Sequence, residues 1–283
     1  MQQVLASLLE QLPDLSPKLR AAGKLILDKP NAVATTSMRE LARQAGVTAP
    51  TLIRLAETLG YDSYQDFKNV FRLAVDNYNF EQRADRLQRK SEADGEATII
   101  HELEQAGQRN IHHFYQHLNQ ADVCRAADLI ITAPTAYVVA ASAPHWMAAY
   151  MQYVGKMAVP HLRVPRTSGD GLIEGLVPIN KGDVLLAMTY NPYARQTIEA
   201  IEFALARGAT LIYLTDSVAA PLADKADVLI QQSTESPQYF PSMVPVIAAI
   251  ETLLAVIVAR SGPEAVSAIA EYAEIRKHRY VSA

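Results

Sequence analysis

The sequence predicts an α/β chain made of two unlike parts: an all-α N-terminal domain, then an α/β domain built on a five-stranded parallel sheet flanked by helices. Two observations predict this division. Up to about residue 120 the apolar residues recur at helical spacing, and from residue 136 short apolar runs alternate with helical patterns. Strands that alternate with helices form parallel sheets with helices on both faces. The 283 residues are enough for two domains with a core each.

The N-terminal domain begins with amphipathic helical patterns. Residues 1–12 form a short one, without the basic segment that opens a signal peptide. Residues 15–28 place Leu19, Ala22 and Ile26 on one side of a helix. After residue 60, an aromatic-rich helix is expected to begin behind the capping residue Ser63.

Between these helices the chain shows the pattern of a helix-turn-helix. Ser37, followed three residues later by a glutamate, forms a capping box that satisfies amide groups at a helix start. Gly46 stands where the first helix must stop, because glycine tolerates the left-handed backbone of a sharp turn. Thr48 is expected to cap the second helix, and Pro50 is tolerated in its first turn.

The second helix of such a pair enters the DNA major groove. Thr48, Thr51 and Arg54 are expected to face outward near its start, where they can reach phosphates or base edges. The residues expected to contact DNA are Ser37, Thr48, Ala49, Pro50, Thr51 and Arg54. On spacing alone, an ordinary two-helix corner of an all-α domain remains the alternative.

Charge and cysteine usage agree with an intracellular DNA-binding protein. The net charge is −4, but residues 1–75 carry +2 and the remainder carries −6. The basic excess therefore lies with the helix-turn-helix. The single cysteine, Cys124, suits a reducing cytosol. The longest apolar candidate for a membrane span, residues 243–259, is interrupted by Pro245 and Glu251, so a cytoplasmic protein without a membrane partner is expected.

Residues 75–95 are polar and charged, which predicts a solvated linker with some helical character. The expected domains are a DNA-binding domain (1–75), a linker and connecting helix (76–120) and a C-terminal domain (121–283). Buried strands are expected at residues 136–140, 161–164, 183–189, 210–215 and 227–231. Helices are expected at residues 97–118, 121–131, 144–156, 195–206 and 243–259.

The chain resembles the RpiR family of bacterial transcription regulators over residues 15–72. The matching run is Gly46-Val47-Thr48, then Thr51, then Arg54, then Leu59-Gly60-Tyr61. Residues 121–260 resemble the sugar isomerase (SIS) domain that this family carries next, through Gly182-Asp183-Val184, Arg207-Gly208-Ala209 and Leu214-Thr215-Asp216-Ser217. The resemblance implies a regulator that binds double-stranded operator DNA, forms a homodimer or homotetramer, senses a sugar phosphate or related acidic metabolite, and needs no cofactor.

Ligands of open parallel sheets bind beyond the carboxyl ends of the strands. In this chain the loops 141–144, 190–195 and 233–240 form that edge. The resemblance implies a glycine-rich first loop and a Ser-x-Ser-Gly-x-Ser/Thr loop, but this chain has neither. The residues expected to line the effector pocket are Ser142, Thr189, Tyr190, Asn191, Tyr193, Arg195, Thr197, Glu235 and Ser236. Arg195 beside free helix amides can grip a phosphate or carboxylate; alternatively, it lies on the surface and the two tyrosines are packing residues.

A sugar isomerase with an appended DNA-binding domain is the second interpretation. It requires a base, for which Glu235 and His145 are candidates, although a solvated loop glutamate and a packed histidine are the more common roles. His112, His113 and His117 have the spacing of metal ligands, yet no cysteine or carboxylate cluster accompanies them. A solvated helix face is expected there, and no catalytic or metal-binding residue is assigned.

Overall fold

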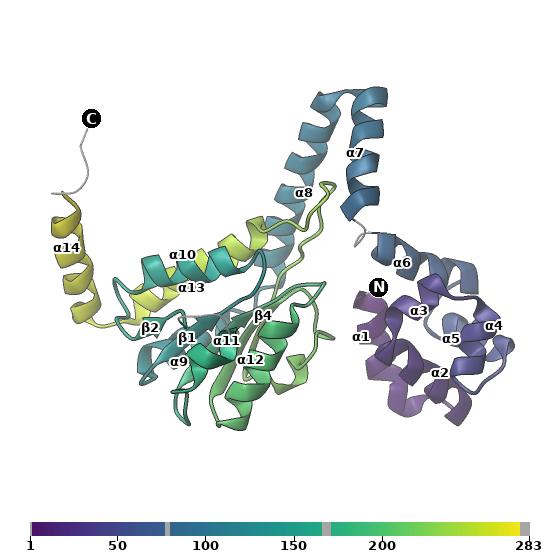
Figure 1. Ribbon diagram of the computed structural model, residues 1–283, viewed down its shortest axis with the longest axis horizontal. Coiled ribbons are helices and arrows are strands. Elements are labelled where there is room, and N and C mark those ends of the chain that lie inside the picture. Colours follow the sequence, from purple (N-terminus) through teal and green to yellow (C-terminus); the bar gives the residue numbers. More distant parts are fainter. Residues whose placement is uncertain (1, 77–79, 166–170, 278–283) are drawn as a thin grey trace. The chain divides into compact units, whose positions relative to one another are not determined.

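The computed structural model describes residues 2–76, 80–165 and 171–277, which form two compact units. The N-terminal unit comprises residues 1–99 together with 237–240, and the sheet unit comprises residues 100–236 and 241–283. Figure 1 shows the helices of the first unit and the strands and helices of the second.

The described part of residues 1–99 in the N-terminal unit consists of helices and short connections, as the sequence predicted. Its helices are α1 (Gln2–Gln11), α2 (Pro17–Asp28), α3 (Pro30–Thr35), α4 (Met38–Gln44), α5 (Ala49–Thr58), α6 (Tyr64–Asp76) and α7 (Phe80–Asp94), with a 3-10 turn at Leu12–Asp14. Residues 75–95, for which a solvated linker with some helical character was predicted, are more helical than expected, because α7 is a regular and mostly exposed 15-residue helix. The sequence did not predict this full-length helix because α7 is highly polar, and a helix without an apolar stripe gives no periodic hydrophobic signal.

An aromatic cluster forms the centre of the N-terminal core. Phe67 is fully buried in α6, and its ring centroid lies 5.4 Å from that of Tyr61 and 4.9 Å from that of Phe71. Tyr64 packs at 6.0 Å from Phe67, and burial raises the pKa of Tyr64 to about 12. Helix α6 packs against α5 of the helix-turn-helix, in which Leu55 is also fully buried.

The turn between α4 and α5 depends on Gly46. This glycine has φ +66°, in the left-handed region, and its N–H donates to the carbonyl of Arg43 at 3.2 Å. The N–H of Val47 reaches back to the carbonyl of Ala42 at 2.9 Å, so two backbone hydrogen bonds close the turn. This is the helix end that a C-terminal glycine permits and that other residues oppose.

Replacing Gly46 by alanine is expected to lower the free energy of unfolding of the N-terminal unit by about 1 kcal/mol. A Cβ at this position meets no atom within 4 Å, so the cost comes from the backbone alone. Gly107 provides the matched control: it lies inside helix α8 with equally open space, where alanine favours the helix. Urea denaturation should show opposite signs for the two substitutions, and equal signs would contradict this account of the turn.

The sheet unit contains five parallel strands in the order β2-β1-β3-β4-β5. The strands are β1 (Ala136–Val139), β2 (Leu162–Arg163), β3 (Val184–Met188), β4 (Thr210–Thr215) and β5 (Val228–Gln231). Its helices are α8 (Glu96–His117, which begins in the N-terminal unit), α9 (Gln120–Thr132), α10 (His145–Gly155), α11 (Leu172–Leu176), α12 (Arg195–Ala206), α13 (Val244–Arg260) and α14 (Pro263–Lys277). The predicted five-stranded parallel sheet is confirmed.

Side chains alternate between two cores on opposite faces of the sheet, as the period of a strand requires. In β4, Ile212 points into a core shared with α9, α10 and α13, whereas Tyr213 points into a core shared with α11 and α12. Figure 1 shows α10 and α13 side by side. Among the described residues no single helix is long and apolar enough to cross a membrane; α13 and α14 meet that test only as a pair bent by 117°.

Candidate DNA-binding surface and effector cavity

The first helix of the helix-turn-helix begins as the capping box predicts. Ser37 is the N-cap of α4, and its hydroxyl accepts a hydrogen bond from the N–H of Glu40 at 3.2 Å. The Glu40 carboxylate bonds the guanidinium of Arg43 at 2.8 and 2.6 Å, which lowers the pKa of Glu40 to about 2. From α6, Lys68 donates to the carbonyl of Thr36 at 2.7 Å and so fixes the chain just before α4.

The start of the second helix differs in one respect from the sequence prediction. Thr48 is the N-cap of α5 and is exposed, but its hydroxyl bonds the hydroxyl of Thr51 at 3.1 Å rather than a helix amide. The expected outward orientation of Thr51 is wrong, since Thr51 is only 9% exposed. Its position in the first turn places it on the same face as Leu52 and Leu55, which pack inward.

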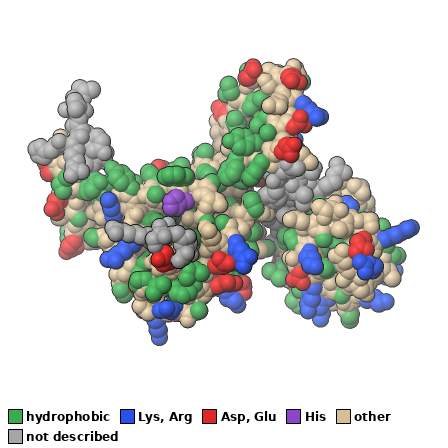
Figure 2. Space-filling model, in the orientation of Figure 1, with side chains coloured by type: hydrophobic (Ala, Val, Ile, Leu, Met, Phe, Trp, Pro, Cys, Tyr) green, Lys and Arg blue, Asp and Glu red, His purple; other side chains and the backbone are tan. Residues whose placement is uncertain are grey.

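The remaining residues expected to contact DNA lie on the open side of this helix pair. Ser37, Pro50 and Arg54 are exposed, and Ala49 is partly exposed. The guanidinium of Arg54 makes no hydrogen bond or ion pair with any residue that the structure describes. Figure 2 shows Lys and Arg side chains distributed over this unit beside acidic ones. A long, uncommitted cation at the start of an exposed helix can reach a phosphate or a base edge.

A cavity of about 400 Å³ opens in the sheet unit at the carboxyl end of β1. It is lined by Ala140, Ala141, Ser142, His145, Gly171, Leu172 and Gln196. These residues come from the β1–α10 connection, the start of α11 and the first turn of α12. The strands β1 and β3 are neighbours in the sheet, and the chain leaves them toward opposite faces, with α10 on one face and α12 on the other. This arrangement is a topological switch point, where open α/β sheets bind their ligands.

Two threonines expected to bind the effector instead hold the loops around this cavity. The hydroxyl of Thr197, which is fully buried, accepts from the N–H of Ala141 at 3.0 Å and joins α12 to the β1 loop. The hydroxyl of Thr189, 2% exposed, accepts from the N–H of Ala194 at 3.0 Å. Both hydroxyls position the cavity wall, and neither residue lines it.

The β3 loop is filled by its own side chains. Tyr190 is buried, its hydroxyl donates to Oε1 of Gln232 at 2.8 Å, and burial raises its pKa well above the ordinary value. The N–H of Asn191 donates to Oδ2 of Asp216 at 3.2 Å, and the Asn191–Pro192 peptide bond is cis. Tyr193 packs half-buried against the core on the α12 side. The packing alternative therefore describes both tyrosines in this structure.

The other expected effector residues divide between the cavity and the surface. Ser142 lines the cavity with a left-handed φ of 59°. The side chain of Arg195 is 91% exposed and pairs with Glu199 at 2.7 Å, as the surface alternative supposes. Glu235 is exposed and Ser236 is partly buried; both lie outside the cavity lining.

Three residues of the cavity lining were not predicted from the sequence. Gly171, Leu172 and Gln196 were not expected there, although Gln196 lies between two residues that were. His145, a candidate base for which packing was the more common alternative, is exposed and lines the cavity, because it begins α10 at the carboxyl end of β1.

The histidines of α8 lie on the solvent side of their helix. His112, His113 and His117 are all exposed, and the rings of His113 and His117 stack with centroids 4.2 Å apart. Within the described ranges there is no group of three or more side chains arranged to hold a metal ion.

Two family models match this chain. The model described as "Helix-turn-helix domain, rpiR family" matches residues 3–76, and the model described as "SIS domain" matches residues 129–259. An uncharacterised HTH-type transcriptional regulator of Caldanaerobacter subterraneus is 26% identical over 84% of this chain and 83% of its own length. The "Bifunctional protein glk" of Paraburkholderia xenovorans is 24% identical over 77% of this chain, which spans only 33% of that protein.

Solved structures share the fold. The Vibrio vulnificus NanR protein complexed with ManNAc-6P superposes with a TM-score of 0.61 at 18% identity, covering 99% of this chain and 100% of that one. The sugar isomerase domain of an RpiR transcription factor from Sphaerobacter thermophilus gives a TM-score of 0.57 at 23% identity, covering 61% of this chain and 96% of that one. At these identities the likeness concerns the fold, and of these two matches only the one to NanR extends over both units.

Proposed function

The chain belongs to the RpiR family of helix-turn-helix proteins, and from that membership we propose that it is a transcription regulator controlled by an acidic sugar derivative. One observation carries the proposal: the chain combines two features. The first is an rpiR-type helix-turn-helix in which the start of α5 is exposed, and the second is a sheet unit with a cavity at its switch point. The first part suits DNA, and the second suits a small molecule.

The N-terminal unit would bind operator DNA with the start of α5 in the major groove. Ser37, Thr48, Ala49, Pro50 and Arg54 would face the DNA, and Thr51 would support Thr48 from inside. A homodimer or homotetramer would present paired helices to two half-sites about one helical turn or a multiple apart. We infer a cytoplasmic location from this role.

The DNA-binding part is tested by incubating the purified full chain with sheared bacterial DNA and sequencing the retained fragments. Enrichment of an inverted repeat with that half-site spacing would support the proposal. Retention of fragments without any shared sequence would contradict specific operator binding. Light scattering on the same sample measures whether the chain is a dimer or a tetramer.

The effector would bind in the 400 Å³ cavity, a size in the range of small-molecule sites. Ser142, His145 and Gln196 offer a hydroxyl, an imidazole and an amide there. These groups can hold sugar hydroxyls, and a protonated imidazole can pair with a phosphate or carboxylate. Because NanR was solved with ManNAc-6P, amino-sugar phosphates are the first compounds to test, followed by sugar acids and neutral sugars.

In a thermal-shift screen we expect an acidic sugar derivative to raise the unfolding midpoint of the sheet unit. A ligand present at 100 times its Kd stabilises the folded state by about 2.7 kcal/mol. His145→Gln should weaken binding about tenfold, since it removes the imidazole from the cavity wall. His101→Gln, on the exposed surface of α8, is the matched control and should bind like the wild type. An equal loss of affinity in both variants would mean that the ligand does not bind in this cavity.

Sugar isomerase activity is the second candidate, and the position of His145 in the cavity is the observation that favours it. Glu235, the other candidate base, lies outside the described lining. The regulator proposal predicts that compounds found in the screen are not converted, which NMR of the incubated mixture measures. Turnover that disappears in His145→Gln and persists in His101→Gln would make the chain an enzyme.

A further inference from the structure

Residues 233–242, within the connection between β5 and α13, form a closed loop that is called the 233–242 loop and is immediately preceded by Gln232. Parts of this loop belong to each of the two units. The N–H of Ser242 donates to the carbonyl of Thr234 at 2.9 Å, so the two ends of the loop meet at a neck. This is the construction of a compact surface loop with adjacent ends. The tip, residues 237–240, is part of the N-terminal unit, whereas the residues on both sides belong to the sheet unit.

The neck is fixed to the ends of the strands by buried polar groups. Gln232, 1% exposed, donates its N–H to the carbonyl of Thr215 at 2.9 Å and accepts from the hydroxyl of Tyr190 at 2.8 Å. Asn110 of α8, 5% exposed, donates to the carbonyl of Glu235 at 2.6 Å. Buried polar groups with specific partners hold one geometry, because losing a partner is costly.

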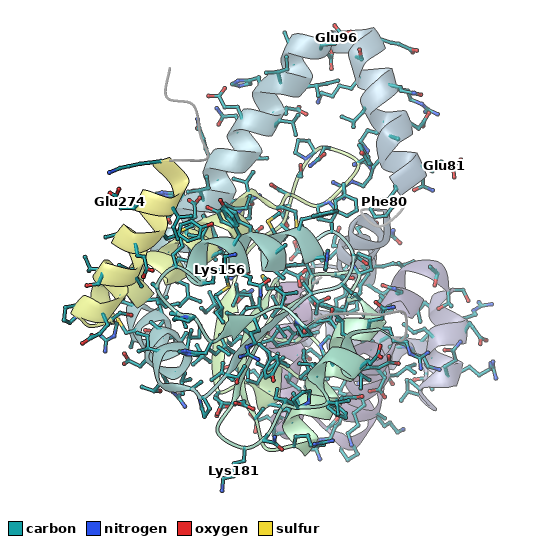
Figure 3. All side chains as sticks on the ribbon, turned by 60° about the vertical axis from the view of Figure 1, so that its left-hand side comes forward. Phe80, Glu81, Glu96, Lys156, Lys181 and Glu274 are labelled. Atoms are coloured by element: carbon teal, nitrogen blue, oxygen red, sulfur yellow. The ribbon has the colours of Figure 1, made fainter. Side chains whose placement is uncertain are left out.

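The tip is held by α7 within the N-terminal unit. The guanidinium of Arg83 donates to the carbonyl of Gln238, and the ring of Phe80 stacks on that of Phe240 with centroids 5.2 Å apart. Figure 3 labels Phe80 at the start of α7. Arg83 is the one buried residue among the described residues 80–94. A buried guanidinium needs acceptors, and the Gln238 carbonyl supplies one. Because a 15-residue helix by itself is marginal in water, this tip contributes to the order of α7.

The neck and the effector cavity share one connection. The β3–α12 loop carries Tyr190, which holds Gln232, and it leads directly into Gln196 on the cavity wall. The hydrogen bond from the N–H of Ala194 to the hydroxyl of Thr189 connects the two ends of this loop and restricts its movement. If a ligand displaces the β3–α12 loop at the cavity, the hydrogen bond between Tyr190 and Gln232 is therefore expected to lengthen or break.

We propose that the 233–242 loop couples the effector cavity to α7, through Tyr190 and Gln232 at its neck and Arg83 and Phe80 at its tip. The regulatory consequence, that cavity occupancy alters operator binding through α7, rests on the proposed function. The coupling itself concerns contacts that exist without DNA or effector.

Hydrogen exchange of the full chain, followed by mass spectrometry, tests the coupling. Tyr190→Phe removes the hydroxyl that bonds Gln232 and keeps the ring. We expect amides of residues 80–94 to exchange about fivefold faster, the effect of one lost hydrogen bond. Tyr150→Phe is the matched control, because it removes a tyrosine hydroxyl bonded to Glu251 at 3.0 Å in the same unit. It should leave α7 at the wild-type rate.

A second pair of variants tests the contact between α7 and the tip of the loop. Arg83→Gln should accelerate exchange in α7 and residues 237–240 while β3 and β4 stay unchanged, and Arg86→Gln, on the exposed side of α7, should change neither. The coupling would be overturned if Tyr190→Phe changed only the surroundings of residues 190 and 232, or if Tyr150→Phe accelerated α7 equally. A chain that retains no DNA would instead overturn the proposed function and leave the exchange result standing.

Discussion

Replacing Arg54 by alanine is expected to weaken operator binding by about 10- to 100-fold, the effect of losing one base-edge contact of about 1–3 kcal/mol. Arg54 is exposed on α5 and its guanidinium has no hydrogen-bonding partner among the described residues, so the guanidinium is available to DNA. For the same reason the substitution should leave the stability of the N-terminal unit within about 0.5 kcal/mol of the wild type. Fluorescence anisotropy on a retained fragment measures the affinity.

The salt dependence of the same titration separates two roles for Arg54. A contact to a base edge relaxes the sequence preference at one position, whereas a phosphate contact reduces the salt slope by about one and weakens all sequences alike. Arg163→Ala, an exposed arginine on β2 in the sheet unit, is the control and should not change DNA affinity. Wild-type affinity in Arg54→Ala would show that the recognition helix has been placed wrongly.

The elements of the sheet unit were predictable from sequence because parallel strands are continuous apolar runs with helical patterns between them. Each predicted strand lies within two residues of its observed bounds. Three short or exposed helices were missed: α3, α11 and α14. The first two span 6 and 5 residues, too few for a period to appear, and α14 is mostly exposed. In these helices the surrounding fold, rather than the local pattern, decides the structure.

The cavity was harder to predict because the direction of a hydroxyl depends on tertiary neighbours. Thr189 and Thr197 are residue types that bind ligands, yet in this fold both hydroxyls accept backbone hydrogen bonds that shape the loops. His145 and Gln196 reach the cavity because strand order brings the ends of β1 and β3 together. Only the order β2-β1-β3-β4-β5, which no local sequence pattern specifies, makes those two connections neighbours.

Phe67→Ala is expected to destabilise the N-terminal unit by about 3–5 kcal/mol, several times the effect of Gly46→Ala. Phe67 is fully buried, and its ring contacts those of Tyr61, Tyr64 and Phe71, so truncation removes apolar burial, aromatic contacts and volume together. A domain of this size is stable by about 5–15 kcal/mol in total. The destabilisation by Phe67→Ala is therefore a large fraction of the free energy of unfolding that keeps α4 and α5 folded.

The consequence should be confined to one unit, because the Phe67 cluster belongs entirely to the N-terminal unit. In hydrogen exchange of the full chain, amides of α2, α4, α5 and α6 should open far more often, while β1, β3 and β4 keep their protection. Operator affinity should fall with the unfolded fraction of the N-terminal unit, and effector binding should persist. Phe67→Leu fills most of the space and should recover most of the protection. Unchanged exchange in α4 and α5 of Phe67→Ala would mean that the aromatic cluster does not support the helix-turn-helix.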